Sequence, residues 1–168
     1  VYFAKDWIKL IVSGFKVAFN RKEKGKHSED VSKNGKLFWY LVAATIPAAI
    51  LSLILDWVSD KIINGNVLIE MGLIAGALVV LGIVLYIVDK KTDSSVNYEN
   101  ISLKQSLLIG ISQAIAAAFP GTSRSGITMT VARSLKIDRE SSAKFSFLLA
   151  TPITLAAVIV DLKYFVFN

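Results

Sequence analysis

A short polar segment in the second half of the chain concentrates the side chains that could do chemistry. It consists of Pro120, Gly121, Thr122, Ser123, Arg124, Ser125, Gly126, Ile127 and Thr128. The guanidinium group of Arg124 is planar and carries five N–H donors, which suit phosphate oxygens, and the neighbouring hydroxyl groups can add donors. We expect Gly126 to open a helix, whose free N–H groups and positive dipole end also attract anions. The segment therefore predicts a phosphate-binding site.

Two other interpretations of this segment were weighed. A nucleotide-binding P-loop has two glycines at the spacing of Gly121 and Gly126, but the required lysine is replaced by Ile127 and no β-strand pattern precedes it. The other interpretation is a serine-rich turn that only caps the following helix, which would explain Ser125. It would not explain an arginine in apolar surroundings, where we expect Arg124 to be buried and to need an anionic partner or substrate.

The composition indicates what surrounds this segment. Of the 168 residues, 54% are hydrophobic and 19% are charged, and the mean hydropathy is +0.55. These values exclude a disordered chain and favour a membrane protein. The chain has no cysteine and a single histidine, His27, so thiolate sites and multi-histidine metal centres within it are excluded. The net charge of +6 lies mostly in loop lysines, which indicates topology and anionic lipid rather than a nucleic-acid partner.

The apolar runs predict one all-α domain, a polytopic membrane helix bundle, over residues 1–168. About 20 apolar residues cross the hydrocarbon core of a bilayer, which matches transmembrane helices at residues 37–55, 67–88 and 145–165. Residues 1–19 predict an amphipathic helix at the membrane interface, with packing on protein as the alternative. The polar residues 21–36 and 56–66 are expected to form a loop and a short turn.

The charges predict that residues 101–136 form a re-entrant hairpin instead of a simple crossing. Residues 21–36 contain six lysines and arginines, whereas residues 56–66 contain one, so the first stretch is expected on the cytoplasmic side. A simple crossing would place Arg133, Lys136 and Arg139 outside, and a break at Pro120 followed by a return brings them inside. Non-helical backbone at membrane depth is tolerated where it is buried in protein or lines a wet cavity, so the break predicts a site.

Several motifs resemble those of one protein family. They are Ile46-Pro47-Ala48, Gly110-x-x-Gln113, Pro120-Gly121-x-Ser123-Arg124-Ser125-Gly126-x-Thr128, Phe145-Ser146-Phe147-Leu148-Leu149-Ala150-x-Pro152 and Asp161-Leu162. On these residues the chain closely resembles the undecaprenyl-pyrophosphate phosphatase family, the bacitracin-resistance membrane enzymes of the bacterial cell-wall lipid cycle. The pattern runs through essentially the whole chain.

The resemblance implies an enzyme that hydrolyses undecaprenyl diphosphate to undecaprenyl phosphate and phosphate, in the inner (plasma) membrane, at a site formed by two inverted repeats. It implies a catalytic role for three residues: Arg124, Ser123 and Ser125. It implies substrate binding by five more: Gly121, Thr122, Gly126, Thr128 and Gln113. It also implies a divalent cation, Mg²⁺ or Ca²⁺, whose ligands are expected mostly outside this chain; no metal ligand is assigned within it.

Three further expectations concern the completeness of the enzyme, an alternative function and the packing of one helix. The chain begins at Val1 and lacks the family's earlier motif of glutamates, serines and a histidine, so we expect a fragment that is incomplete as an enzyme. A polyprenyl-phosphate transporter or flippase is the alternative function, because broken helices of inverted repeats also form carrier sites. Gly72-x-x-x-Gly76 predicts a close-packing face, either within the molecule or at a homodimer contact.

Overall fold

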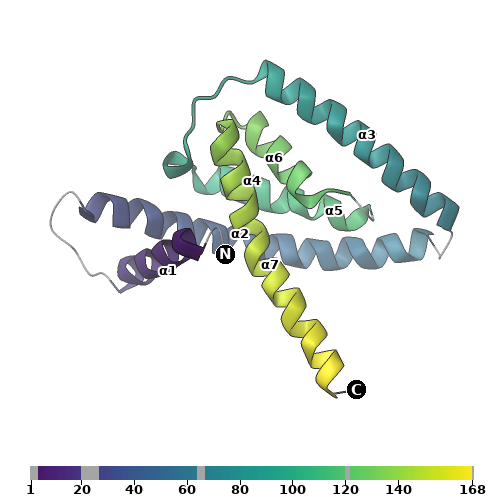
Figure 1. Ribbon diagram of the computed structural model, residues 1–168, viewed down its shortest axis with the longest axis horizontal. Helices are drawn as coiled ribbons and strands as arrows, with labels where there is room; N and C mark the ends of the chain where they lie inside the picture. Colours follow the sequence, from purple (N-terminus) through teal and green to yellow (C-terminus); the bar gives the residue numbers. More distant parts are fainter. Residues whose placement is uncertain (1–3, 20–26, 64–66, 120–121, 168) are drawn as a thin grey trace.

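The computed structural model describes residues 4–19, 27–63, 67–119 and 122–167, and this part of the chain is all-α (Figure 1). Its helices are α1 (Ala4–Ala18), α2 (His27–Ile63), α3 (Val67–Lys91), α4 (Leu103–Gln113), α5 (Ile115–Ala118), α6 (Arg124–Ser134) and α7 (Arg139–Phe167), with a short 3-10 helix η1 (Tyr98–Asn100). The only extended pairing among these residues is an isolated bridge between Val96 and Ile137. The all-α prediction is confirmed.

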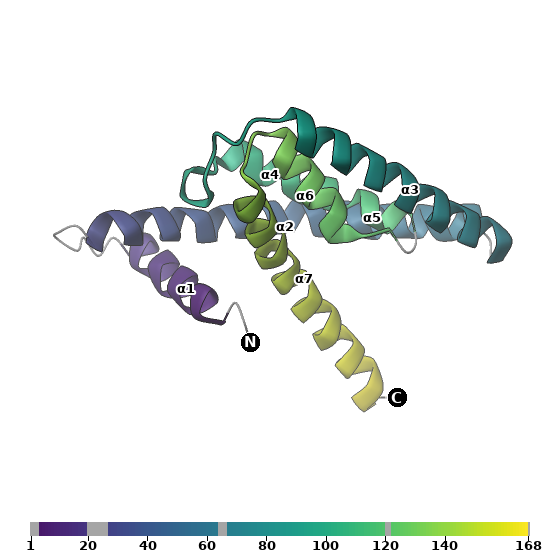
Figure 2. The ribbon, with the colours of Figure 1, turned by 45° about the horizontal axis from the view of Figure 1, so that its top comes forward.

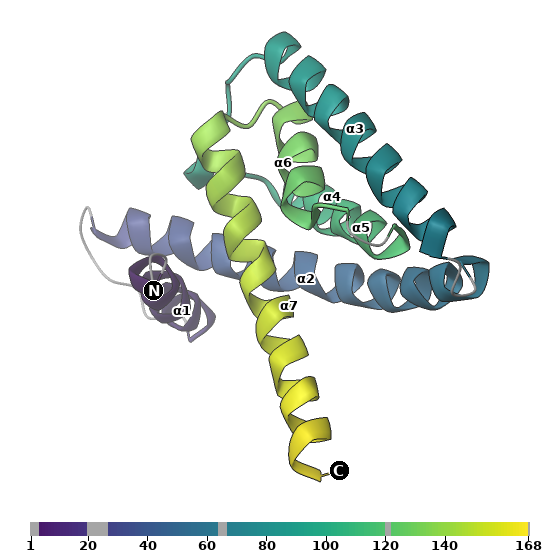
Figure 3. The same cartoon turned by 45° about the vertical axis from the view of Figure 1, so that its right-hand side comes forward.

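Helix α2 is the base on which the other elements are arranged. Helices α4, α5 and α6 lie between α2 and α3, and α7 crosses α2 and continues to its other side (Figures 2 and 3). The buried core lies where these helices meet, and it includes Leu41 of α2, Ile109 of α4, Ala132 of α6 and Phe145 of α7. The three short helices are therefore held inside a frame made by the three long ones.

Two of the long helices are apolar and long enough to cross a membrane. These are Glu29–Ser59 of α2, with a mean hydropathy of 2.1 over an 18-residue stretch, and α3, with 2.7 over such a stretch and no buried residue. A helix of the length of α3 spans about 37 Å, more than the hydrocarbon core of a bilayer. The predicted ranges 37–55, 67–88 and 145–165 fall within α2, α3 and α7, and their membrane placement stays a prediction.

The predicted ends of the first apolar helix were wrong. Helix α2 begins at His27 and ends at Ile63, so most of the expected loop at residues 21–36 and of the expected turn at residues 56–66 is helical. Gly35 lies inside α2 and is buried where α1 packs, because a Cβ atom there would lie 2.4 Å from Cγ2 of Val17. The glycine was interpreted as a helix breaker, but the contact with α1 favours a helix at this position.

Helix α1 packs on α2 through one face. The indole Nε1 of Trp39 donates to the carbonyl oxygen of Gly14 at 3.2 Å, and Leu10 is buried. The opposite face exposes large apolar side chains, including Ile8 and Phe15. The structure thus shows the protein contact, while the membrane-interface role of this helix stays a prediction.

The chain turns back on itself between α4 and α6. The side chain of Gln105, in the first turn of α4, donates to the carbonyl oxygen of Leu135, just after α6, at 3.1 Å. The bridge between Val96 and Ile137 ties the segment before α4 to the turn after α6. The start of α4 and the end of α6 therefore lie together, as a hairpin requires, and the break near residues 119–123 lies at the far end (Figure 1).

Candidate functional site: the break before helix α6

The polar segment forms the N-terminal end of α6. Ser123 is the N-cap residue, and its Oγ accepts a hydrogen bond from the backbone N–H of Gly126 at 3.1 Å. The hydroxyl oxygens of Ser123 and Ser125 are 3.4 Å apart. The turn interpretation expected hydroxyl groups of this segment to cap the helix; the residue that does so is Ser123, and Ser125 lies in the first helical turn.

Arg124 is the first residue of α6, and its side chain is exposed. The expectation of a buried arginine is therefore wrong for this chain as described. Among the described residues no carboxylate pairs with its guanidinium group, so its donors remain available to an anion. An unpaired arginine at a helix N-terminus joins a full positive charge to the partial positive charge of the helix end.

Gln113, at the end of α4, is buried without a hydrogen-bond partner. Only 2% of the residue is exposed, and neither Nε2 nor Oε1 bonds to any described residue. The Oγ1 atom of Thr122 is likewise buried and unpaired in this part of the structure. Leaving a buried polar group unsatisfied costs about 1–3 kcal/mol, so both side chains favour a polar group supplied from outside the described residues. Both were predicted to bind substrate.

Thr128, which was predicted to bind substrate, is buried between α6 and α7. Its Oγ1 contacts the carbonyl oxygens of Arg124 and Ser125, each at 3.1 Å, and it shares a short hydrogen bond with Ser146 of α7. The residue is 1% exposed. Its hydroxyl group thus links the first turn of α6 to α7, and direct substrate binding by Thr128 stays a prediction.

The structure describes only one of the two glycines of the segment. Gly121 lies outside the described residues. Gly126 lies close to α3, because a Cβ atom at this position would be 3.0 Å from Cδ2 of Leu81 and 3.1 Å from Oγ of Ser123. A larger residue would therefore crowd both the cap and the contact with α3. This positioning role was not foreseen from the sequence.

An apolar groove begins beside the break. It has a volume of about 460 Å³ and lies between α3 and the helices α5 and α6. Its lining includes Gly72, Gly76, Ile115, Phe119, Thr122 and Ile127. A Cβ atom on Gly72 or Gly76 would meet nothing within 4 Å, so close packing of these glycines inside the described molecule is not observed. They leave open space in the groove instead.

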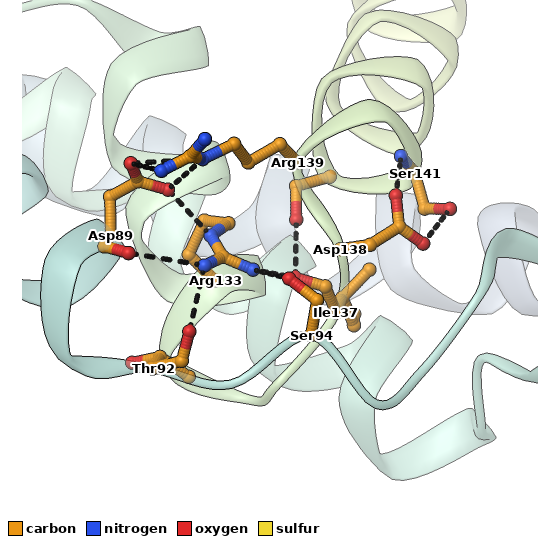
Figure 4. A network of polar contacts seen from close by, with 9 residues as sticks. Asp89, Thr92, Ser94, Arg133, Ile137, Asp138, Arg139 and Ser141 are labelled. Carbon is orange, nitrogen blue, oxygen red and sulfur yellow. Dashed lines mark hydrogen bonds and ion pairs between the residues drawn. The ribbon is translucent and has the colours of Figure 1, made fainter.

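The opposite end of α6 holds a second arginine, which is buried. The side chain of Arg133 is 4% exposed, and all five of its N–H groups have acceptors (Figure 4). The acceptors are Asp89 Oδ1 at 2.8 Å, Ser94 Oγ at 3.0 Å, and the carbonyl oxygens of Ile137 at 2.6 Å, Thr92 at 2.9 Å and Asp89 at 3.3 Å. Arg133 joins α3, the loop after α3 and the turn after α6.

Asp89 also binds a second, exposed arginine. Arg139, at the start of α7, contacts both carboxylate oxygens of Asp89 through Nε and Nη2, at 2.8–3.0 Å (Figure 4). The carboxylate raises the pKa of Arg139 by accepting these hydrogen bonds. From the sequence, both arginines were interpreted only as topology signals. The sequence signal that could have indicated this ion-pair network is Asp89, a carboxylate directly after a long apolar run.

The described residues contain no group of three His, Cys, Asp or Glu side chains that could hold a metal ion. The described part of the chain by itself therefore does not supply a complete ligand set for the divalent cation that the resemblance implies. Its ligands were expected mostly outside this chain, and the cation stays a prediction.

The geometry defines a class of protein: an all-α chain with membrane-length helices and an exposed arginine at a helix N-terminus beside an apolar groove. The sequence matches the family described as "Bacitracin resistance protein BacA" over residues 1–168, and the chain belongs to this family. Three relatives named undecaprenyl-diphosphatase come from Pelotomaculum thermopropionicum, Gemmatimonas aurantiaca and Caldicellulosiruptor bescii, with identities of 41%, 39% and 38% over 162, 161 and 162 residues. The matches cover 96% of this chain and 54–55% of each relative, so the chain spans about half their length.

Proposed function

We propose that the protein of which this chain is part hydrolyses undecaprenyl diphosphate to undecaprenyl phosphate and phosphate, in the cell-wall lipid carrier cycle. The observation that carries the proposal is the position of exposed Arg124 at a helix N-terminus directly beside an apolar groove. A lipid diphosphate has the same two parts, an anionic head and an apolar chain. The name of the relatives, undecaprenyl-diphosphatase, supports this choice of lipid.

The head of the substrate would bind at the first turn of α6. The N–H of Gly126 and the N–H of Ile127 already bond to Ser123, at 3.1 Å each. The first-turn N–H groups of Arg124 and Ser125 therefore remain for phosphate oxygens. Together with the guanidinium group they form a preorganised set of donors for the charge on the distal phosphoryl group as its bond to the bridging oxygen breaks.

The two serines would act beside the arginine. Oγ of Ser123 accepts the N–H of Gly126, so its hydroxyl hydrogen is available to a phosphate oxygen, and Oγ of Ser125 lies 3.4 Å away. Gln113 and Thr122 would supply further polar contacts, because burial without partners favours a bound polar group. Mg²⁺ or Ca²⁺ would complete the site, with ligands mostly outside this chain.

The prenyl chain would lie in the apolar groove. The groove starts at Thr122, next to the N-cap Ser123, and continues along α3 past Gly76 and Gly72. Its volume of about 460 Å³ is within the usual range of ligand pockets and holds part of a long prenyl chain. The rest of the chain would extend into the bilayer of the inner membrane, which the protein crosses several times.

Phosphate release tests the proposal. The full-length protein in detergent, supplied with Mg²⁺ or Ca²⁺, is expected to free phosphate from a polyprenyl diphosphate. If no phosphate is released while the lipid crosses the membrane of a proteoliposome, the enzyme proposal is wrong and the transporter alternative is favoured.

A groove variant tests where the lipid chain binds. Gly76→Phe adds a ring at the groove, at a position where a Cβ atom meets nothing within 4 Å. We expect it to raise KM for a long polyprenyl diphosphate and to change KM little for a short one. Ala75→Phe is the matched control, since Ala75 is an exposed residue of α3 outside the groove lining. Equal effects of both variants would contradict the placement of the chain.

A further inference from the structure

A second groove lies at the other end of α6 and is separate from the proposed diphosphate site. It has a volume of about 320 Å³ and lies between the C-terminal half of α3 and the helices α6 and α7. Gly82, Leu85 and Met129 line its apolar part, and Tyr86, Asp89 and Arg139 line its polar part. Two residues of α6 line this groove, Met129 and Arg133, and they lie about 8 and 14 Å from Arg124 along the helix axis.

The polar part of this groove carries an excess of positive charge. Asp89 is its one acidic lining residue, and Arg133 and Arg139 both bond to it. Lys90 adds a third cation beside the groove, with its Nζ 5.8 Å from the centre of the Tyr86 ring. Two arginines contact the one carboxylate, and Lys90 lies over an aromatic ring that lines the groove, so the lining carries net positive charge and attracts anions.

Only one of the two arginines has donors left for a ligand. All five N–H groups of Arg133 bond to the protein. The side chain of Arg139 is 74% exposed and reaches Asp89 through Nε and Nη2, and its Nη1 has no acceptor among the described residues. Arg139 is therefore the residue that could hold an anion at the opening of the groove.

The apolar part of the groove lies directly beside this cation. Gly82 leaves the surface of α3 open, since a Cβ atom there would meet nothing within 4 Å. Tyr86 is 65% exposed near the end of a membrane-length helix, a position typical of aromatic residues at the membrane interface. The groove thus joins an apolar floor to a cationic opening near the end of a membrane-length helix.

We propose that this groove binds an anionic phospholipid, with its phosphate at Arg139 and one acyl chain along Gly82, Leu85 and Met129. Basic pockets between helices at the membrane surface bind such head groups. A singly charged phosphodiester, as in phosphatidylglycerol, suits the groove better than a diphosphate, because Asp89 would repel additional negative charge. The lipid would connect α3 with the start of α7.

Competition between two phospholipids tests this proposal. The full-length protein is equilibrated with equal amounts of phosphatidylglycerol and phosphatidylcholine, and the retained lipids are counted by native mass spectrometry. The wild-type protein is expected to prefer phosphatidylglycerol. Arg139→Gln is expected to lower that preference about five-fold, which corresponds to one cationic side chain at a membrane surface.

Two more variants separate the groove from general surface charge and from misfolding. Lys104→Gln removes an equal charge from an exposed residue outside the groove and is expected to keep the wild-type preference. Gly82→Phe fills the apolar part, leaves every charge in place and is expected to reduce retention of phosphatidylglycerol. The proposal is overturned if Gly82→Phe retains phosphatidylglycerol as the wild type does, or if Lys104→Gln loses as much preference as Arg139→Gln. Phosphate release is measured separately, so this outcome is independent of the proposed reaction.

Discussion

The two ends of helix α6 carry the same residue type in opposite states. At the N-terminal end Arg124 is exposed and has no carboxylate partner among the described residues. At the C-terminal end Arg133 is buried, and each of its N–H groups has an acceptor. An arginine whose donors are all used stabilises a fold, whereas one with free donors can bind a ligand. Arg124 and Arg133 therefore differ in function because their hydrogen-bond partners differ, although the residue type is the same.

The two ends of α6 also differ in whether the polar groups around them have hydrogen-bond partners. Before α6 the helical structure is interrupted, since α5 ends at Ala118 and α6 begins at Arg124. Two nearby polar side chains, Gln113 and Thr122, are unpaired within the described structure. After α6 the N–H of Lys136 bonds to the carbonyl oxygen of Arg133, and the N–H of Ile137 bonds to that of Ala132. These two bonds form a Schellman motif, which satisfies the helix end internally. One end is open to a ligand and the other is closed by the protein.

The largest expected effect is on stability at the closed end. Arg133→Met leaves the backbone carbonyl groups of Asp89, Thr92 and Ile137 without their buried donor, and each buried acceptor left unsatisfied costs about 1–3 kcal/mol. Thermal unfolding of the protein in detergent measures the loss. Arg139→Met is the control, because Arg139 binds the same carboxylate from an exposed position. Equal losses for both variants would show that burial of Arg133 contributes nothing.

The next effect is on activity at the open end. Arg124→Lys keeps the charge but loses the planar set of donors, so phosphate release is expected to fall about 100-fold or more. The melting temperature should stay at the wild-type value, since the side chain is exposed and has no ion-pair partner in the described structure. Arg139→Lys, the same change in an exposed arginine outside the diphosphate site, should keep phosphate release. Normal turnover of Arg124→Lys would make Arg124 a structural cation only.

A smaller effect is expected from the cap of α6. Ser123→Ala removes the acceptor of the Gly126 N–H, and loss of an N-cap costs about 1 kcal/mol of stability. Urea or thermal unfolding checks this value. Ser134→Ala, at the other end of the helix, removes an exposed hydroxyl group and should change stability by less than about 0.5 kcal/mol. If the two alanine variants are equally stable, Ser123 does not act as a cap.

The smallest effect concerns the turn that closes α6. Lys136 has a φ of 66°, in the left-handed region that glycine adopts without a steric cost. Lys136→Gly is therefore expected to be more stable than Lys136→Ala by about 1 kcal/mol. Comparing the melting temperatures of the two variants checks this. A more stable alanine variant would mean that the turn relaxes when the lysine is replaced.

The sequence alone determined the elements and the direction of the chain. Apolar runs of membrane length predicted helices at residues 37–55, 67–88 and 145–165, and all three fall within α2, α3 and α7. The distribution of cationic residues predicted a re-entrant hairpin at residues 101–136; the hydrogen bond from Gln105 to the carbonyl oxygen of Leu135 joins its two ends, and its entry into the membrane stays a prediction. These properties depend on residues close in sequence, so their pattern is visible without a structure.

Helix ends were less well determined. The polar residues before residue 37 contain Gly35 and were interpreted as a loop, yet α2 begins at His27. Packing of α1 against this part of α2 overrides the local preference of glycine, because the close approach needs a residue without a side chain. Such a contact joins residues far apart in the sequence and leaves no local pattern.

The sequence also determined the chemical content of the break before α6: one arginine, several hydroxyl groups and two glycines next to apolar helices. Only the tertiary structure decided which arginine is exposed, that Ser123 is the cap, that Thr128 bonds to Ser146, and that Gln113 is buried without a partner. The physical reason is that residue type fixes how many hydrogen bonds a side chain can make. Whether those bonds are used by the protein or left for a ligand depends on which distant segments fold against it.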